Sequence, residues 1–177
     1  MKLKFVIVKK ILVSFLLSFL IFSKSIACEI LNVPIETPIE IAVQKFDFLD
    51  TYDEKNFAPK TSVIYDESAS DYCSTGGFKN TMLEVMVFES KVAHIKLTSP
   101  KKNQLNEVYK FTRDFIQDPG DESQQPGWTG YVDLSVGNLI IWYSRDELLG
   151  YPFETLEITN TNMEKYIEGE HVEKDPF

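Results

Sequence analysis

The sequence is short of the residues that most often carry chemistry, since only two of its 177 residues are cysteines and two are histidines. Neither His94 nor His171 belongs to a His-x-x-His pattern, so a zinc site built on histidine is not predicted. The Gly-x-Ser-x-Gly, Ser-x-x-Lys, Walker A and Gly-x-Gly-x-x-Gly patterns are absent as well. We therefore predict no cofactor, no metal and no enzyme, and for His94 a surface or hydrogen-bonded structural role rather than that of a general base.

Glycine and proline are also scarce, with eight of each, and no internal repeat is visible. These counts exclude collagen-like and low-complexity chains, while an apolar fraction of 44% excludes intrinsic disorder. The length suits one domain.

The first 27 residues have the three parts of a secretory signal peptide. Four lysines lie among residues 2–10, residues 11–22 are mostly apolar, and Ser25-Ile26-Ala27 offers small residues before a cleavage point. The uncharged stretch is shorter than the roughly 18 to 20 residues that cross a bilayer, which disfavours a membrane anchor. We predict cleavage near Ala27, a periplasmic or secreted address, and a single acidic domain at residues 28–177 with a frayed tail from about 170.

Cationic residues are rare once this leader is set aside. Its five lysines leave 13 Lys and Arg against 27 Asp and Glu, a net charge of −14. Such a field disfavours nucleic acids and anionic membranes, which attract basic proteins. It favours a cationic protein partner, although the charge would also serve solubility alone.

The two cysteines, Cys28 and Cys73, predict one disulfide in an oxidising compartment. The alternative is a lipid on Cys28, because Ala27-Cys28 resembles the end of a bacterial lipoprotein signal, although Ser25 stands where leucine is usual. Only that alternative would attach the protein to a membrane.

Strand and helix periodicities predict an α+β fold around an antiparallel sheet built from hairpins. Residues 81–89 and 92–98 alternate as one hairpin, and residues 131–136 and 139–143 as another around Gly137-Asn138, with residues 61–65 and 153–159 as further strands. One main amphipathic helix is expected at about 100–117, with Ser99 as its N-cap and Pro100 first. Short C-terminal helices are expected at 144–150 and 161–169, while residues 38–49 fit either a helix or a strand.

The loop at residues 124–130 offers a candidate contact site. Trp128 stands between glycines and near three acids, an arrangement typical of interface hot spots, although the ring could instead cap the end of the sheet. The candidate partner-binding residues are Trp128, Asp118, Asp121, Glu122 and Trp142.

These features favour an exported protein-binding domain. The most concrete form is an immunity protein or inhibitor that neutralises a basic toxin or a cell-wall hydrolase, and in outline the chain resembles small exported immunity proteins. The alternatives are a small secreted hydrolase that uses paired carboxylates, or a lipid-anchored structural envelope protein.

Overall fold

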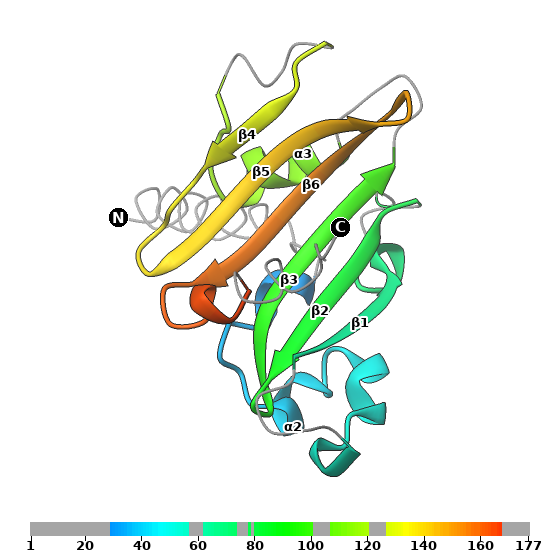
Figure 1. Ribbon diagram of the computed structural model, residues 1–177, viewed down its shortest axis with the longest axis vertical. Helices are drawn as coiled ribbons and strands as arrows, with labels where there is room; N and C mark the ends of the chain where they lie inside the picture. The colour runs from blue at the N-terminus through cyan, green and yellow to red at the C-terminus, as the bar shows by residue number, and fades with distance from the viewer. Residues whose placement is uncertain are drawn as a thin grey trace, which may run out of the picture.

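The computed structural model describes residues 29–56, 62–73, 78, 80–100, 107–120 and 127–167. These residues form a six-stranded antiparallel sheet with a few helical segments, which confirms the α+β prediction (Figure 1). The strand order is β1-β2-β3-β6-β5-β4. The predicted leader, Cys28 and the acidic tail lie outside the described residues.

The sheet consists of two three-stranded meanders that meet where β3 pairs with β6. The first meander contains β1 (Val63–Ser68), β2 (Met82–Phe88) and β3 (Lys91–Pro100). The second contains β4 (Gly130–Asp133), β5 (Leu139–Leu148) and β6 (Tyr151–Asn160). Within each meander, strands that follow one another along the chain pair with each other. The β2–β3 and β4–β5 hairpins are the two that the alternating sequence predicts.

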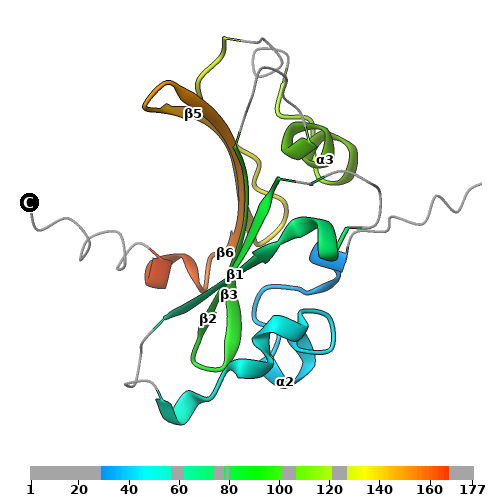
Figure 2. The ribbon, with the colours of Figure 1, turned by 90° about the vertical axis from the view of Figure 1, so that its right-hand side faces the viewer.

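Most helical segments lie on one face of the sheet, whereas the helical turn at residues 164–167 lies on the other (Figure 2). The segments that precede β4 are η1 (Glu29–Asn32), α2 (Ile39–Ala42), η2 (Asp47–Thr51), η3 (Glu54–Asn56), η4 (Ala69–Asp71) and α3 (Glu107–Phe115). Residues 38–49, open between helix and strand in the sequence, are thus partly helical. The core lies between these segments and the inward residues of the strands, among them Leu83, Val85, Ile95, Leu97, Ile141, Tyr143 and Leu156.

Two predicted helices need correction. Ser99 and Pro100 do not cap α3, because they end β3 opposite Glu154 and Phe153, and the described helix begins at Glu107. Residues 144–148 are not helical either, since they continue β5 opposite β6. In both places strand pairing overrides a local capping signal. Residues 164–167 are helical within the predicted 161–169.

The predicted hairpin around Gly137-Asn138 has the expected register. Val136 pairs with Leu139, Val132 with Tyr143, and the Leu134 amide donates to the Ile141 carbonyl. Gly137 has a φ of +67°, the positive value that a type II′ turn needs at its first central position.

The beginning and end of the described chain are joined through Glu36. Its Oε2 accepts hydrogen bonds from Asn160 Nδ2 at 3.0 Å and from Asn162 Nδ2 at 3.2 Å. Because Asn160 ends β6, this contact fixes the segment that precedes α2 against the centre of the sheet.

Candidate functional site

Trp128 does not stand free on its loop but is half buried against the sheet. Its ring is stacked on that of Tyr143, with centroids 6.1 Å apart and planes at 5°. Gly130 leaves room for this ring, because a Cβ there would lie 3.1 Å from it. The packing matches the second interpretation of Trp128, a ring that caps the sheet, and its role in partner binding stays a prediction.

A buried polar network lies beneath Trp128. Arg145 and Glu154 stand opposite one another on β5 and β6 and are 3% and 0% exposed. Arg145 donates to the Tyr143 hydroxyl at 3.3 Å, and its guanidinium lies 5.6 Å from the centre of a Trp128 ring. Glu154 Oε2 accepts the Tyr109 amide at 3.1 Å, so the carboxylate faces the positive N-terminal turn of α3.

Burial raises the pKa of the Tyr143 hydroxyl above its ordinary value, and the Glu154 carboxylate raises it further. Tyr143 therefore stays protonated at neutral pH and serves as a neutral partner of Arg145. Because these groups lie inside the protein, they give the second meander a rigid base for the strands that extend beyond it.

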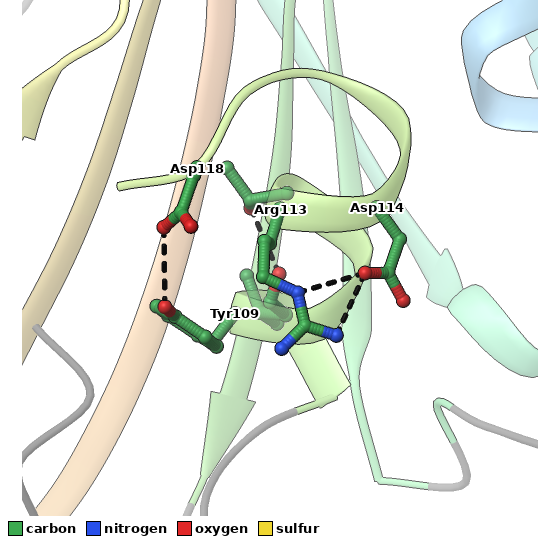
Figure 3. Close-up of polar contacts among 6 residues, drawn as sticks. Tyr109, Arg113, Asp114 and Asp118 are labelled. Carbon is green, nitrogen blue, oxygen red and sulfur yellow. Dashed lines mark hydrogen bonds and ion pairs between the residues drawn. The ribbon is translucent and has the colours of Figure 1, made fainter. Parts of the chain in front are cut away.

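Asp118 is joined to the same network (Figure 3). The Tyr109 hydroxyl donates to Asp118 Oδ1 at 3.3 Å, the Gly120 amide donates to the same atom at 2.9 Å, and the Tyr109 ring meets Tyr143 edge-on. The structure thus brings Trp128 and Asp118 together through two tyrosines. Beside them, Arg113 forms an ion pair at 2.7 Å with the exposed Asp114.

The other predicted contact residues do not join this group. Trp142 neighbours Tyr143 on β5, so its side chain points to the opposite face of the sheet, where it is half buried. Asp121 and Glu122 lie outside the described residues. Within the described part of the chain, the predicted contact residues therefore do not form one surface.

Of the two cysteines predicted to form a disulfide, the structure describes only Cys73. It is 2% exposed and is not a free thiol. Because Cys28 lies outside the described residues, the disulfide between them stays a prediction. His94 is 6% exposed and its Nε2 lies 3.2 Å from Glu157 Oε2, which fits the structural role expected for it.

The tip of the β5–β6 hairpin carries three exposed apolar side chains close together in the sequence, while Tyr131 on β4 is exposed as well. Leu148, Leu149 and Tyr151 are 66%, 89% and 69% exposed. Beside them stand the exposed acids Asp146 and Glu147. We refer to residues 146–152 as the hairpin tip.

The hairpin tip extends beyond both neighbouring strands. Pairing with β4 ends at Arg145, opposite Gly130, and pairing with β3 ends at Phe153, opposite Pro100. Within the described part of the chain, the two arms of the tip are therefore paired only with each other, as far as Leu148 opposite Tyr151. Figure 2 shows this end of the hairpin curving away from the side that carries α3.

The turn at the tip is strained. Leu149 has a φ of +54° and Gly150 a φ of +81°, the two positive values of a type I′ turn. A leucine at positive φ costs about 1 to 2 kcal/mol, and Asn or Gly would remove most of that cost. An exposed, strained leucine contributes nothing to the core, which points to a role outside it.

The sequence predictions did not include this tip, because Ser144-Arg145-Asp146-Glu147 fits a capping box. A signal was nevertheless present. The alternation that begins at residue 139 continues through Tyr143 and Arg145, and Leu149-Gly150 puts glycine at a central turn position.

An acidic cleft of about 370 Å³ lies at the other end of the molecule, lined by Asp47, Phe48, Glu67, Asp71 and Tyr72. The Tyr72 hydroxyl donates to Asp47 Oδ1 at 2.6 Å. The paired carboxylates of the hydrolase alternative could be sought here, but that alternative stays a prediction.

No family model, curated protein or solved structure matches this chain. Among the described residues, no three His, Cys, Asp or Glu side chains are grouped as metal ligands, and no helix is long and apolar enough to span a membrane.

Proposed function

We propose that this chain is a protein-binding domain that contacts its partner through the hairpin tip. The observation that carries the proposal is the exposure of Leu148, Leu149 and Tyr151 on a hairpin that extends past its neighbouring strands. Leucine and tyrosine side chains gain most when a partner removes them from water. A rigid paired hairpin also loses little conformational freedom on binding.

The charge around the tip narrows the kind of partner. Asp146 and Glu147 flank the apolar residues, and no lysine or arginine occurs between Arg145, which is buried, and Lys165. A pocket that receives the tip should thus be apolar at its centre and basic at its rim. Attraction between unlike charges would accelerate the encounter.

A basic toxin or cell-wall hydrolase whose cleft is blocked by the tip fits this description. We therefore keep an exported inhibitor or immunity protein as the proposed biological role. The leader and the net charge of −14 after its removal support this proposal, as does the tip, and a periplasmic or secreted location is part of it.

The proposal is tested by affinity capture from extract of the source cells with three baits, followed by salt elution. The first bait is the wild-type protein, and the second carries Leu148→Ser, Leu149→Asn and Tyr151→Ser together. The third is a matched control, Ile64→Thr, which removes an exposed apolar side chain from β1 (42% exposed). Circular dichroism verifies that all three are folded.

We expect one basic protein in stoichiometric amount on the wild type and the control, at least tenfold less on the tip variant, and elution by salt. Equal recovery on all three baits would place the contact elsewhere on the protein. Absence of any stoichiometric partner would count against a protein-binding function.

A further inference from the structure

An apolar cavity of about 310 Å³ lies between the sheet and the helical segments, away from the hairpin tip. Its floor is formed by Ile95, Ile141 and Ile158 from β3, β5 and β6, which are 2%, 2% and 7% exposed. Its mouth is formed by Pro34, Phe115 and Val136, which are all exposed. The cavity thus has a buried end and an open end.

The walls come from segments that are far apart in the sequence. The N-terminal segment supplies Pro34, the end of α3 supplies Phe115, and the turn before β5 supplies Val136. Figure 2 shows α3 and the N-terminal segment on the same side of the sheet. A space of this size is unusual for a core, because protein interiors are normally close-packed.

We propose that this cavity binds a linear alkyl chain with an uncharged head group. Every described side chain that lines the cavity is apolar, so no described side chain offers a hydrogen-bond partner to a ligand inside it. Ligand pockets typically enclose 300 to 1,000 Å³. The volume holds about ten groups of the size of a water molecule, at roughly 30 Å³ each, which corresponds to an alkyl chain of about ten carbons.

The head group would lie at the mouth, between Phe115 and Val136. Among the described residues, no lysine or arginine lines the cavity, and the chain carries a net negative charge. A carboxylate head would therefore lack a counter-ion and would be repelled by the protein as a whole. An alcohol or another neutral head would be preferred.

The test is titration calorimetry of the purified protein with linear alcohols that are shorter than, equal to and longer than decanol, and with decanoate. We expect saturable 1:1 binding whose affinity increases about fourfold for each added methylene and stops increasing near ten carbons. Decanol should bind more tightly than decanoate. A lysophospholipid with the same chain shows whether a lipid can supply the alkyl group.

Two variants locate the binding. Val136→Trp narrows the mouth at a residue that is 44% exposed, so it should leave the fold intact and weaken decanol binding at least tenfold. Ile64→Trp makes the same kind of change on the exposed side of β1 and should leave affinity unchanged. An affinity that keeps increasing beyond ten carbons, or that is unchanged in Val136→Trp, would indicate adsorption to the surface and would overturn the proposal.

Discussion

The β2–β3 and β5–β6 hairpins end in turns of the same backbone type but meet different surroundings. Glu89 and Ser90 have φ values of +48° and +58°, and Leu149 and Gly150 have +54° and +81°. The first turn is tied to the N-terminal segment, since Ile39 N donates to the Ser90 carbonyl at 2.9 Å and Ser90 Oγ donates to Glu54 at 2.8 Å. The second turn projects its leucine into solvent.

This difference shows where the sequence serves the fold and where it does not. The covered turn has polar residues whose hydrogen bonds are made within the protein, while the exposed turn has apolar residues that the fold leaves in water. Exposed apolar clusters usually mark interaction sites. Away from the turns, the difference in burial is reversed. In the β5–β6 hairpin the charged residues Arg145 and Glu154 are buried, whereas in the β2–β3 hairpin Lys96 and Glu84 are only partly covered.

The largest effect on the free energy of unfolding is expected at these charged residues. Glu154→Ala should lower the free energy of unfolding by about 3 to 5 kcal/mol, because it leaves Arg145 charged and buried. The matched change Glu84→Ala removes a partly exposed ion pair and should cost about 0 to 1 kcal/mol. Urea unfolding monitored by circular dichroism measures both, and equal losses would contradict the contrast.

The dependence of stability on pH tests the buried polar residues of the β5–β6 hairpin in another way. Burial and then Glu154 raise the pKa of Tyr143 in the folded state, whereas an unfolded tyrosine ionises near about pH 10. Above that pH the unfolded state has lost a proton that the folded state keeps. The contribution of Tyr143 to stability should therefore be constant below about pH 10 and decrease above it by up to about 1.4 kcal/mol per pH unit.

Tyr143→Phe is the control for this decrease. The variant lacks the hydroxyl, so its stability between about pH 10 and 12 should decrease less steeply than that of the wild type. Parallel curves for the two proteins would show that Tyr143 is not the group responsible.

A smaller effect of the opposite sign is expected at the hairpin tip. Leu149→Asn should raise the free energy of unfolding by about 1 kcal/mol, because asparagine tolerates positive φ. The same change should weaken partner capture. Leu148→Asn, on the strand beside the turn, should bring no stabilisation, and a loss of stability in Leu149→Asn would remove the evidence for strain.

The smallest effect is expected at the covered turn. Glu54→Gln weakens an exposed hydrogen bond to Ser90 and should cost about 0.5 kcal/mol in thermal unfolding. Glu147→Gln at the other tip should leave stability unchanged but slow partner association. A loss of stability in Glu147→Gln but not in Glu54→Gln would mean that the hairpin tip, and not the β2–β3 turn, supports the fold.

Local periodicity was sufficient to predict most of the sheet. Alternation identified β2, β3 and the register of the Gly137-Asn138 hairpin, because side chains on neighbouring strands must share a face. The extent of β3 and β5 could not be predicted, since Ser99-Pro100 and residues 144–147 have the composition of helix starts. Ser99-Pro100 pair with β6 residues that lie more than fifty positions away. Residues 144–147 pair with β6 residues on the far side of the next turn. A short sequence window does not show either pairing.

The candidate site was predicted less well than the fold. Aromatic content correctly pointed to Trp128 as a large side chain on a loop, but the stacking on Tyr143 needs the sheet to bring residues 128 and 143 together. Trp142 was grouped with Trp128 although adjacent positions on β5 lie on opposite faces. The hairpin tip was not predicted because a helical interpretation of residues 144–150 left no turn there.

The hydrogen bonds from Asn160 and Asn162 to Glu36 also affect the order of events during synthesis. A ribosome adds about 5 to 20 residues per second, and the N-terminal segment emerges well before the two asparagines that fix it. The first meander can form its hairpins before β6 has been synthesised, but the contact across the sheet must wait until β6 is complete. The complete six-stranded sheet can therefore form only when nearly all of the chain has been translated.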